Sequence, residues 1–471
     1  MKFHLKVEGV NFASCLYDTN DISVIRGSSL MLDSIADPVA TALATSQCQY
    51  VEQEWAGAST AKFTFEADER TARKALDAVK ARLSEDPQRH LSFVASIGHS
   101  DQVVEARNRA AQFRQWTVPD CAVPDATVPD ALDGMRPAAP DCGDNIKGAL
   151  SPSVQARLEH GRKNRRGFFE SRVAKVLPQD IAFCESFHDM VRDAPDWVSE
   201  TVRNKLAVIH FDGDGFGKAR EASTSAADFS HELNAKMQAV LTTLVKEATD
   251  YSVLRLEVLV WGGDDITLVV PAWRALTCLR DFYASTEGMT LAEQAVGFTG
   301  GVIVANYKAP IRQLTALAED AVHLGKAEDA RGGFTFDAFE SAALPENGLV
   351  DHRKRVFGEV TARALSIPGQ KAEALIHMLT EWKSGQARGL PSRSRLYDLL
   401  AADVPDGDAR DTWIVKELER DAERLPVAGD GNSKKVSMPA FQDVARGKSL
   451  ELMLATTMWD YVPTAEQEVD V

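Results

Sequence analysis

Two short acidic runs, each set directly against an apolar stretch rich in β-branched residues, constrain the fold of this chain most strongly. The first run, HFDGDGFGK at 210–218, follows the apolar residues 206–209. The second run, WGGDDIT at 261–267, lies between the largely apolar segments 256–260 and 266–270. These flanking segments have the composition of strands. Carboxylates at the end of a buried strand are costly unless a metal ion or water compensates them, so the runs predict a functional site at one end of a sheet.

The second run predicts a β-hairpin. Gly262 and Gly263 between two strand-like segments indicate a tight turn, which places Asp264 and Asp265 at its tip. If the strand that ends at Asp212 lies beside this hairpin, three carboxylates converge at one end of the sheet. Such oxygen ligands bind Mg²⁺ or Mn²⁺, and a pair of these ions serves phosphoryl and nucleotidyl transfer.

Three simpler interpretations compete with a metal site. Aspartate and glycine are the ordinary residues of surface turns. An EF-hand loop that starts at Asp212 would place Phe216 at a ligand position and Ser223 at the closing acidic position. A P-loop requires a hydroxyl residue after the lysine, but Ala219 follows Lys218. Because both acidic runs interrupt strands, we favour the catalytic interpretation.

The ordered set of motifs resembles the palm catalytic domain of the GGDEF and class III nucleotidyl cyclase superfamily. The likeness includes the segment FTGGV at 298–302 and a downstream helix that carries Ala321 and Lys326, and it covers roughly residues 204–340. Within this superfamily the chain is most similar to the polymerase-like large subunit of type III CRISPR complexes. The second palm of that subunit carries GGDD and makes cyclic oligoadenylates from ATP.

The resemblance implies two bound Mg²⁺ or Mn²⁺ ions. Asp212 and Asp264 would bridge the ions, Asp265 would add a further ligand, and the carbonyl of Gly213 would complete one coordination shell. One ion would lower the pKa of the attacking ribose hydroxyl. The other would neutralise charge on the leaving pyrophosphate.

The resemblance also implies a set of nucleotide-binding residues. Gly262 and Gly263 would let the backbone approach the phosphates, Phe216 belongs to the same set, and Lys326 would reach the triphosphate. The alternative for Lys326 is an ordinary lysine at a helix C-terminus. Diguanylate cyclases read guanine with an asparagine eight residues after the first metal-binding aspartate, where this chain has Arg220. This departure favours ATP as the substrate.

The first hundred residues repeat the pattern of the catalytic segment. WAGAST at 55–60 aligns with WGGDDI at 261–266, so Ala58 and Ser59 replace the two aspartates and this copy is expected to bind no metal. The order of its expected elements is that of a ferredoxin-like βαββαβ domain. A helix is expected at 33–44.

The segment GSS at 27–29 precedes the helix expected at 33–44. Its backbone N–H groups could bind a phosphate, as helix N-termini do, and an ordinary helix cap is the alternative.

The expected fold class is α+β, with two ferredoxin-like palms. A degenerate palm is assigned to 1–100 and the catalytic palm to 204–345. Between them, 101–203 forms a helical linker with a Pro-rich loop, in which Val-Pro-Asp recurs every five residues. Residues 346–471 form a helical domain, with helices expected at 350–364, 370–382, 392–402, 411–425 and 449–459.

The linker contains the most basic run of the chain, between Arg157 and Arg172. It could contact triphosphates or RNA, or it could be a solvated helix whose Phe168 and Phe169 dock on the palm. The net charge of −16 argues against a protein that coats nucleic acid.

The remaining composition indicates a cytoplasmic protein without a membrane anchor. Six cysteines lack CxxC spacing, and neither a signal peptide nor a membrane-spanning run is evident. Because the chain starts directly in the first palm, we also expect no HD nuclease domain.

The leading functional hypothesis is a nucleotidyltransferase that makes cyclic oligonucleotides, with ATP as substrate, in CRISPR-type antiviral signalling. Guide or target RNA and CRISPR effector subunits are the partners implied by the resemblance. One alternative is a non-catalytic, nucleotide-binding structural subunit of an RNA-guided complex. A mononucleotide or dinucleotide cyclase is another.

Overall fold

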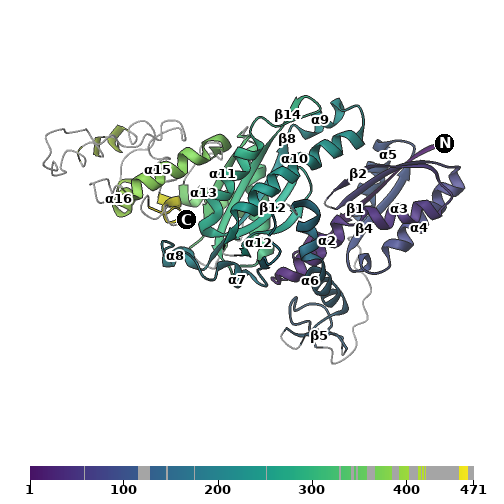
Figure 1. Ribbon diagram of the computed structural model, residues 1–471, viewed down its shortest axis with the longest axis horizontal. Coiled ribbons are helices and arrows are strands. Elements are labelled where there is room, and N and C mark those ends of the chain that lie inside the picture. The colour runs from purple at the N-terminus through teal and green to yellow at the C-terminus, as the bar shows by residue number, and fades with distance from the viewer. Residues whose placement is uncertain are drawn as a thin grey trace.

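In the computed structural model, a four-stranded and a six-stranded sheet lie beside each other, with helices α2 (Ile22–Asp33) and α6 (Pro152–Val173) at their junction (Figure 1). The structure describes residues 1–57, 59–114, 128–139, 141–144, 147–173, 176–250, 252–327, 330–340, 344–345, 348–357, 366–384, 392–401, 412–414, 416–417, 420 and 456–464. The repeats of Val-Pro-Asp before residue 128, and Ala58, lie outside these residues.

The four-stranded sheet has the strand order of a ferredoxin-like fold. Its antiparallel order is β2-β3-β1-β4, with β1 (Lys2–Val10), β2 (Gln49–Gly57), β3 (Thr60–Glu66) and β4 (Ser92–Gly98). Alternate residues of β1, such as Phe3 and Leu5, are buried beneath α3 (Ala36–Thr45) and α4 (Glu69–Leu83). Helix α5 (Asp101–Arg114) packs on β1 and β4.

The six-stranded sheet repeats this order and extends it, as β11-β12-β8-β15-β16-β17. Its strands are β8 (Lys205–Asp214), β11 (Glu257–Trp261), β12 (Asp265–Pro271), β15 (Gly297–Asn306), β16 (Gly333–Ala338) and β17 (Ile367–Pro368). Strand β16 runs parallel to β15, and every other pair in the sheet is antiparallel. The expected α+β class is therefore confirmed.

Helices cover both faces of this sheet. They are α9 (Phe216–Ala222), α10 (Ala226–Glu247), α11 (Ala275–Thr286) and α12 (Ile311–Ala327). Phe211 of β8 stacks on Phe282 of α11, whereas the next residue, Asp212, contacts Lys326 of α12. Because successive strand residues point to opposite faces, α11 and α12 lie on opposite sides of β8.

The helix expected at 33–44 corresponds to α3, which spans Ala36–Thr45. A further helix that was not expected, α2, precedes it at 22–33, and Asp21 caps α2 by accepting hydrogen bonds from the N–H groups of Ser23 and Val24. The segment 27–29 therefore lies inside a helix and offers no helix N-terminus to a phosphate.

The glycine in this segment serves helix packing. A Cβ built at Gly27 would lie 1.8 Å from the carbonyl oxygen of Arg157, and one at Gly161 would lie 1.9 Å from that of Ser23. The two glycines let α2 and α6 approach closely, which the local sequence could not reveal.

Most arginines of the basic run are engaged within the protein. Arg157 is fully buried and pairs with Asp18 at 2.9 Å, and Arg172 pairs with Asp33 at 2.7 Å. Arg165 likewise pairs with Glu185. The aromatic rings of Phe168 and Phe169 pack against the main core. These contacts favour the structural interpretation of the run.

Shorter elements complete the described fold. In the C-terminal part these are α13 (Gly348–Phe357), α15 (Ala372–Ser384), α16 (Arg393–Ala401) and a 3₁₀ turn at Trp459–Tyr461. Elsewhere they are α1 (Phe12–Cys15), α7 (Phe187–Val191), α8 (Glu200–Arg203), β5 (Gly143–Asp144), β6 (Gly148–Ala149), β7 (Ala182–Phe183), β9 (Thr249–Asp250), β10 (Val253–Leu254), β13 (Thr290–Leu291) and β14 (Gln294–Ala295).

Helix α15 packs on α11 at the end of the molecule away from the first sheet (Figure 1). Most residues of the helices expected at 411–425 and 449–459 lie outside the described part of the chain. None of the described helices has the length and apolar character needed to cross a membrane.

Candidate functional site

The register of the six-stranded sheet brings the two acidic runs together. Asp212 of β8 pairs directly with Asp265 of β12, so the two side chains leave the sheet on the same face. The backbone N–H of Gly213 donates to the carbonyl oxygen of Asp264 at 2.8 Å. Like charges placed opposite each other in a sheet are destabilising, so this arrangement favours a bound cation.

The turn between β11 and β12 requires a glycine at position 263. The N–H of Gly262 donates to the carbonyl oxygen of Asp265 at 2.7 Å, which closes the turn. Gly263 has φ +85°, and a Cβ there would lie 2.9 Å from Leu233 Cδ2. A Cβ at Gly213 would lie 2.5 Å from the ring of Phe216, so this phenylalanine packs beneath the first run.

Lys326, in the last turn of α12, reaches the first acidic run. Its Nζ lies 2.9 Å from Asp212 Oδ2 and 3.3 Å from Asp214 Oδ1, and it donates to the carbonyl oxygen of Gly213 at 2.7 Å. Two of these oxygens, on Asp212 and Gly213, are expected metal ligands. An ammonium group therefore stands in for a cation there, and hard oxygen donors of this kind fit Mg²⁺ or Mn²⁺.

The three carboxylates expected to bind metal do not form a closed ligand set while Lys326 is in this position. Among the described residues, the group whose possible ligand atoms all lie within 4.8 Å is instead His4, Glu54 and Asp101 on the first sheet. The ammonium of Lys62 lies 2.6 Å from Asp101, so positive charge is already present in that group.

Asp214 is a site residue that the sequence did not single out. Its carboxylate accepts hydrogen bonds from Thr299 Oγ1 at 2.6 Å and from the N–H of Gly332 at 3.2 Å, and it pairs with Arg331 at 3.1 Å. It thereby holds two cationic side chains, those of Lys326 and Arg331, beside the expected metal ligands. Asp214 could have been predicted from its place in the DGD run, whereas Arg331 lies in a loop far away in the sequence, where no motif marks it as a site residue.

The carboxylates at the hairpin have perturbed proton affinities. Burial raises the pKa of Asp265 to about 7, and the charges of Asp264, Asp212 and Glu319 act in the same direction. Burial and the charge of Asp212 also raise the pKa of Asp264. The Asp265 side chain is 56% exposed, so solvent and ions can reach its carboxylate. Both shifts mark negative charge that lacks a compensating cation.

The imidazole beside these carboxylates does not supply that cation. Burial lowers the pKa of His210 to about 4, so the ring is neutral at neutral pH. Its Nδ1 lies 3.0 Å from Thr267 Oγ1 and 3.8 Å from Asp265 Oδ1.

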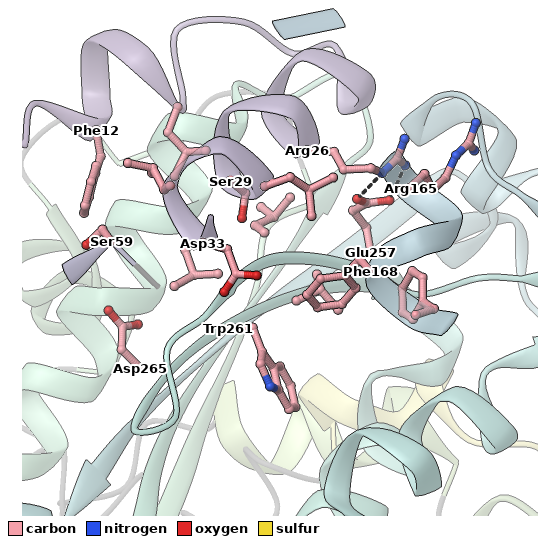
Figure 2. Close-up of a pocket in the computed structure, with 17 residues that line it drawn as sticks. Phe12, Arg26, Ser29, Asp33, Ser59, Arg165, Phe168, Glu257, Trp261 and Asp265 are labelled. Atoms are coloured by element: carbon pink, nitrogen blue, oxygen red, sulfur yellow. Dashed lines mark hydrogen bonds and ion pairs between the residues drawn. The ribbon is translucent and has the colours of Figure 1, made fainter. Parts of the chain in front are cut away.

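A cavity lies between α2, α6 and the edge strand β11, with Asp265 in its lining (Figure 2). Its volume is about 620 Å³ when the space open to solvent is included. The lining is largely aromatic and aliphatic. It also contains the buried ion pair Arg26–Glu257, whose two hydrogen bonds measure 2.7 and 2.5 Å. Such a mixture of apolar walls and a few polar groups is typical of small-molecule sites.

The β2–β3 hairpin of the four-stranded sheet contacts the β11–β12 hairpin of the six-stranded sheet. A Cβ at Gly57 would lie 3.7 Å from the carbonyl oxygen of Gly262, and a Cβ at Gly263 would lie 3.9 Å from the indole of Trp55. Ser59, which aligns with Asp265, lines the same cavity (Figure 2).

Comparison with known protein families gives a match that covers most of the six-stranded sheet. Residues 205–335 match the model of the family described as Cas10/Cmr2, second palm domain. The matched segment contains both acidic runs and Lys326. No curated protein matches the chain.

Solved structures extend the likeness to nearly the whole chain. Csm1 from T. onnurineus is 12% identical with a TM-score of 0.56, over 98% of this chain and 69% of Csm1. A Csm1–Csm4 cassette in complex with cA3 is 12% identical with a TM-score of 0.55, over 98% of this chain and 70% of the matched chain. A type III-B Cmr-beta structure in the apo state is 10% identical with a TM-score of 0.53, over 98% of this chain and 81% of the matched chain. The chain thus shares the fold of the large subunits of type III complexes.

Proposed function

We propose that this chain is a metal-dependent nucleotidyltransferase that joins ATP into cyclic oligonucleotides in CRISPR-type antiviral signalling. The observation that carries the proposal is the pairing of Asp212 with Asp265 across neighbouring strands, which places two carboxylates on one face of the sheet. The fold likeness to Csm1 supports the substrate, because solved Csm1–Csm4 cassettes contain one ATP or cA3.

In this proposal the chain's own residues hold and orient the reactants. Asp212, Asp264, Asp265 and the Gly213 carbonyl would hold two Mg²⁺ or Mn²⁺ ions. Bound ions would lower the pKa of the attacking ribose hydroxyl and neutralise the leaving pyrophosphate. Lys326 would move from Asp212 to the phosphates as the ions enter.

Two further groups would complete the nucleotide site. Arg331, held by Asp214, adds a second cation for the triphosphate. The backbone of Gly262 and Gly263 would approach the phosphates, and the base and ribose would bind in the adjacent cavity lined by Asp265.

The proposal is tested by incubating the purified protein with each labelled nucleoside triphosphate and Mg²⁺ or Mn²⁺. The double variant Asp264→Ala, Asp265→Ala removes two carboxylates, and Asp77→Ala on the exposed face of α4 is the surface control. We expect metal-dependent pyrophosphate release and a cyclic oligoadenylate by mass spectrometry, both lost only in the double variant. A linear, mononucleotide or guanine-containing product would revise the reaction or the base.

A second candidate is a structural subunit that binds nucleotide without turnover. The observation that favours it is the occupation of the expected metal ligands by Lys326. Effector subunits and RNA would then be the partners, as the Csm4 chain is for Csm1 in the solved cassettes. ATP binding without pyrophosphate release, with effector subunits and target RNA present, would support this candidate.

A further inference from the structure

A buried threonine of β15 lies behind the cations of the acidic site. Thr299 is 2% exposed and pairs in register with Asp212 of β8, so both side chains leave the sheet on the face that α12 covers. Asp214 lies two residues after Asp212 on the same strand and shares this face. Thr299 therefore lies beside the carboxylate that pairs with Lys326 and Arg331.

The Thr299 hydroxyl joins three segments of the chain. It donates to Asp214 Oδ2 at 2.6 Å, and it accepts from the N–H of Gly332 at 3.3 Å. The same N–H lies 3.2 Å from Asp214 Oδ2, so the three groups form a closed hydrogen-bonded unit. A threonine hydroxyl has one proton and two acceptor lone pairs, which allows both bonds at once. Strand β15, the end of β8 and the loop that carries Arg331 thus meet at one hydroxyl.

The two oxygens of the Asp214 carboxylate have different partners. Oδ2 accepts from the Thr299 hydroxyl and the Gly332 N–H. Oδ1 lies 3.1 Å from Arg331 Nη1 and 3.3 Å from Lys326 Nζ. Because the two donors hold Oδ2 in place, the carboxylate resists rotation and Oδ1 stays directed at the cations.

The two cations depend on this carboxylate to different degrees. Lys326 also contacts Asp212 at 2.9 Å and the carbonyl oxygen of Gly213 at 2.7 Å, so it keeps partners if Asp214 turns. Arg331 is 54% exposed, and within the described part of the chain its guanidinium pairs with Asp214. A long, exposed side chain regains its rotamer freedom when such a partner turns away. Arg331 is therefore the cation whose position depends on the hydrogen-bonded unit.

The methyl group of Thr299 fixes the direction of its hydroxyl. A Cβ built at Gly325, in the last turn of α12, would lie 3.2 Å from Thr299 Cγ2, so the methyl group packs closely under this turn. A β-branched side chain has few χ1 rotamers. The contact of Cγ2 with α12 favours the rotamer that directs Oγ1 to Asp214.

We propose that Thr299 is a positioning residue, which fixes Arg331 for the triphosphate of the substrate through Asp214 and Gly332. This inference rests on the proposed function, because it assigns Arg331 to the triphosphate. A guanidinium that is held in advance loses less entropy on binding, so it binds phosphate more tightly than a mobile one. Thr299 would thus raise nucleotide affinity without contacting the nucleotide.

The test measures the affinity for α,β-methylene ATP with Mg²⁺ by calorimetry. This analogue carries a triphosphate but releases no pyrophosphate, so no turnover is required. We expect Thr299→Val to weaken binding about 10-fold, the effect of one charge-assisted hydrogen bond, and Thr299→Ser to keep the affinity within about 3-fold. Because the effect passes through Arg331, Thr299→Val should have no further effect in an Arg331→Met background. Mn²⁺ affinity without nucleotide should be unchanged in Thr299→Val.

Thr335→Val is the matched control. Thr335 lies in the same sheet, on β16, is 2% exposed, and its hydroxyl has no hydrogen-bond partner among the described residues. Its replacement should leave the affinity for the analogue unchanged, and thermal unfolding of every variant monitors the fold.

The outcomes separate the two proposals. If the analogue binds equally well to the wild type and to the Asp264→Ala, Asp265→Ala variant, or to neither, the proposed nucleotide site fails and the role of Thr299 fails with it. If binding depends on these aspartates but Thr299→Val binds as the wild type does, only the positioning role is overturned. A loss of the same size in the Arg331→Met background, or a parallel loss of Mn²⁺ affinity, would also overturn it, because the effect would then not pass through Arg331.

Discussion

The ammonium of Lys326 lies 2.9 Å from the Asp212 carboxylate, and the same carboxylate is a proposed metal ligand. A lysine and a metal ion cannot occupy this position together. The lysine therefore stabilises the carboxylate in the site without metal, and in the proposed function it would leave the carboxylate when metal and nucleotide bind. Lys326 would then compete with the metal before the nucleotide binds and contact the phosphates afterwards.

We expect Lys326→Met to tighten Mn²⁺ binding without nucleotide and to impair turnover. Removing the competing cation should increase Mn²⁺ affinity about 10-fold, equivalent to about 1.4 kcal/mol. Loss of the phosphate contact should lower kcat/KM by about 100-fold. Calorimetry and pyrophosphate release measure the two effects, with Lys246→Met, exposed on α10, as control. A decrease in both Mn²⁺ affinity and kcat/KM would contradict competition between Lys326 and the metal ion.

Asp214→Asn should separate nucleotide binding from metal binding. The variant keeps the size of the side chain but removes the charge that pairs with Arg331 and Lys326. We expect KM for the nucleotide to rise about 10-fold while Mn²⁺ affinity without nucleotide is retained. Loss of Mn²⁺ binding as well would make Asp214 a metal ligand instead of an anchor.

Asp265→Asn should stabilise the metal-free protein above neutral pH. Because the pKa of Asp265 is raised to about 7 in the folded chain, against about 3.9 when unfolded, the folded state prefers the protonated form. The charged carboxylate therefore destabilises the fold increasingly as pH rises from about 4 to 7, and the effect is constant above that.

With a discount for the 56% exposure of this side chain, the gain in the free energy of unfolding should be about 1 kcal/mol at pH 8. At pH 4 the gain should vanish. Urea unfolding at both pH values measures it, and an equal gain at pH 4 would show that charge is not the cause.

Gly263→Ala should destabilise the β11–β12 hairpin through backbone strain and through a steric clash. Gly288→Ala, which has the strain alone, separates the two contributions. At Gly263 a methyl group meets both positive φ and the Leu233 side chain, whereas Gly288 has φ +64° and open space around it. We expect Gly288→Ala to lower the free energy of unfolding by about 1 kcal/mol and Gly263→Ala to lower it by about 2–3 kcal/mol. Urea unfolding measures both, and equal costs would remove the steric contribution.

The hairpin and its partner strand were predictable because their signals are local. Gly262 and Gly263 between two apolar segments define a turn, and the ferredoxin-like order then places Asp212 beside Asp265. The pairing of these residues in the sheet agrees with that expectation.

The rest of the site depends on contacts between distant segments. Arg331 reaches Asp214 only through the packing of α12 and β16, and Arg26 pairs with Glu257 across 231 residues of sequence. The segment at 27–29 was misinterpreted for the same reason. Gly27 resembles a turn residue in isolation, and its partner Gly161 lies on another helix. No periodic pattern in the sequence indicates that two such distant residues are in contact.

The cavity between α2, α6 and β11 has unlike walls, with Ser59 on the first copy and Asp265 on the acidic copy. If the two copies were identical, a short oligonucleotide could bind in either direction with equal affinity. In the proposed function, one orientation would place its reacting end at the Asp265 carboxylate and the other would place it against the Ser59 hydroxyl. The difference between these two residues would therefore give the cavity a polarity and orient a growing chain of nucleotides.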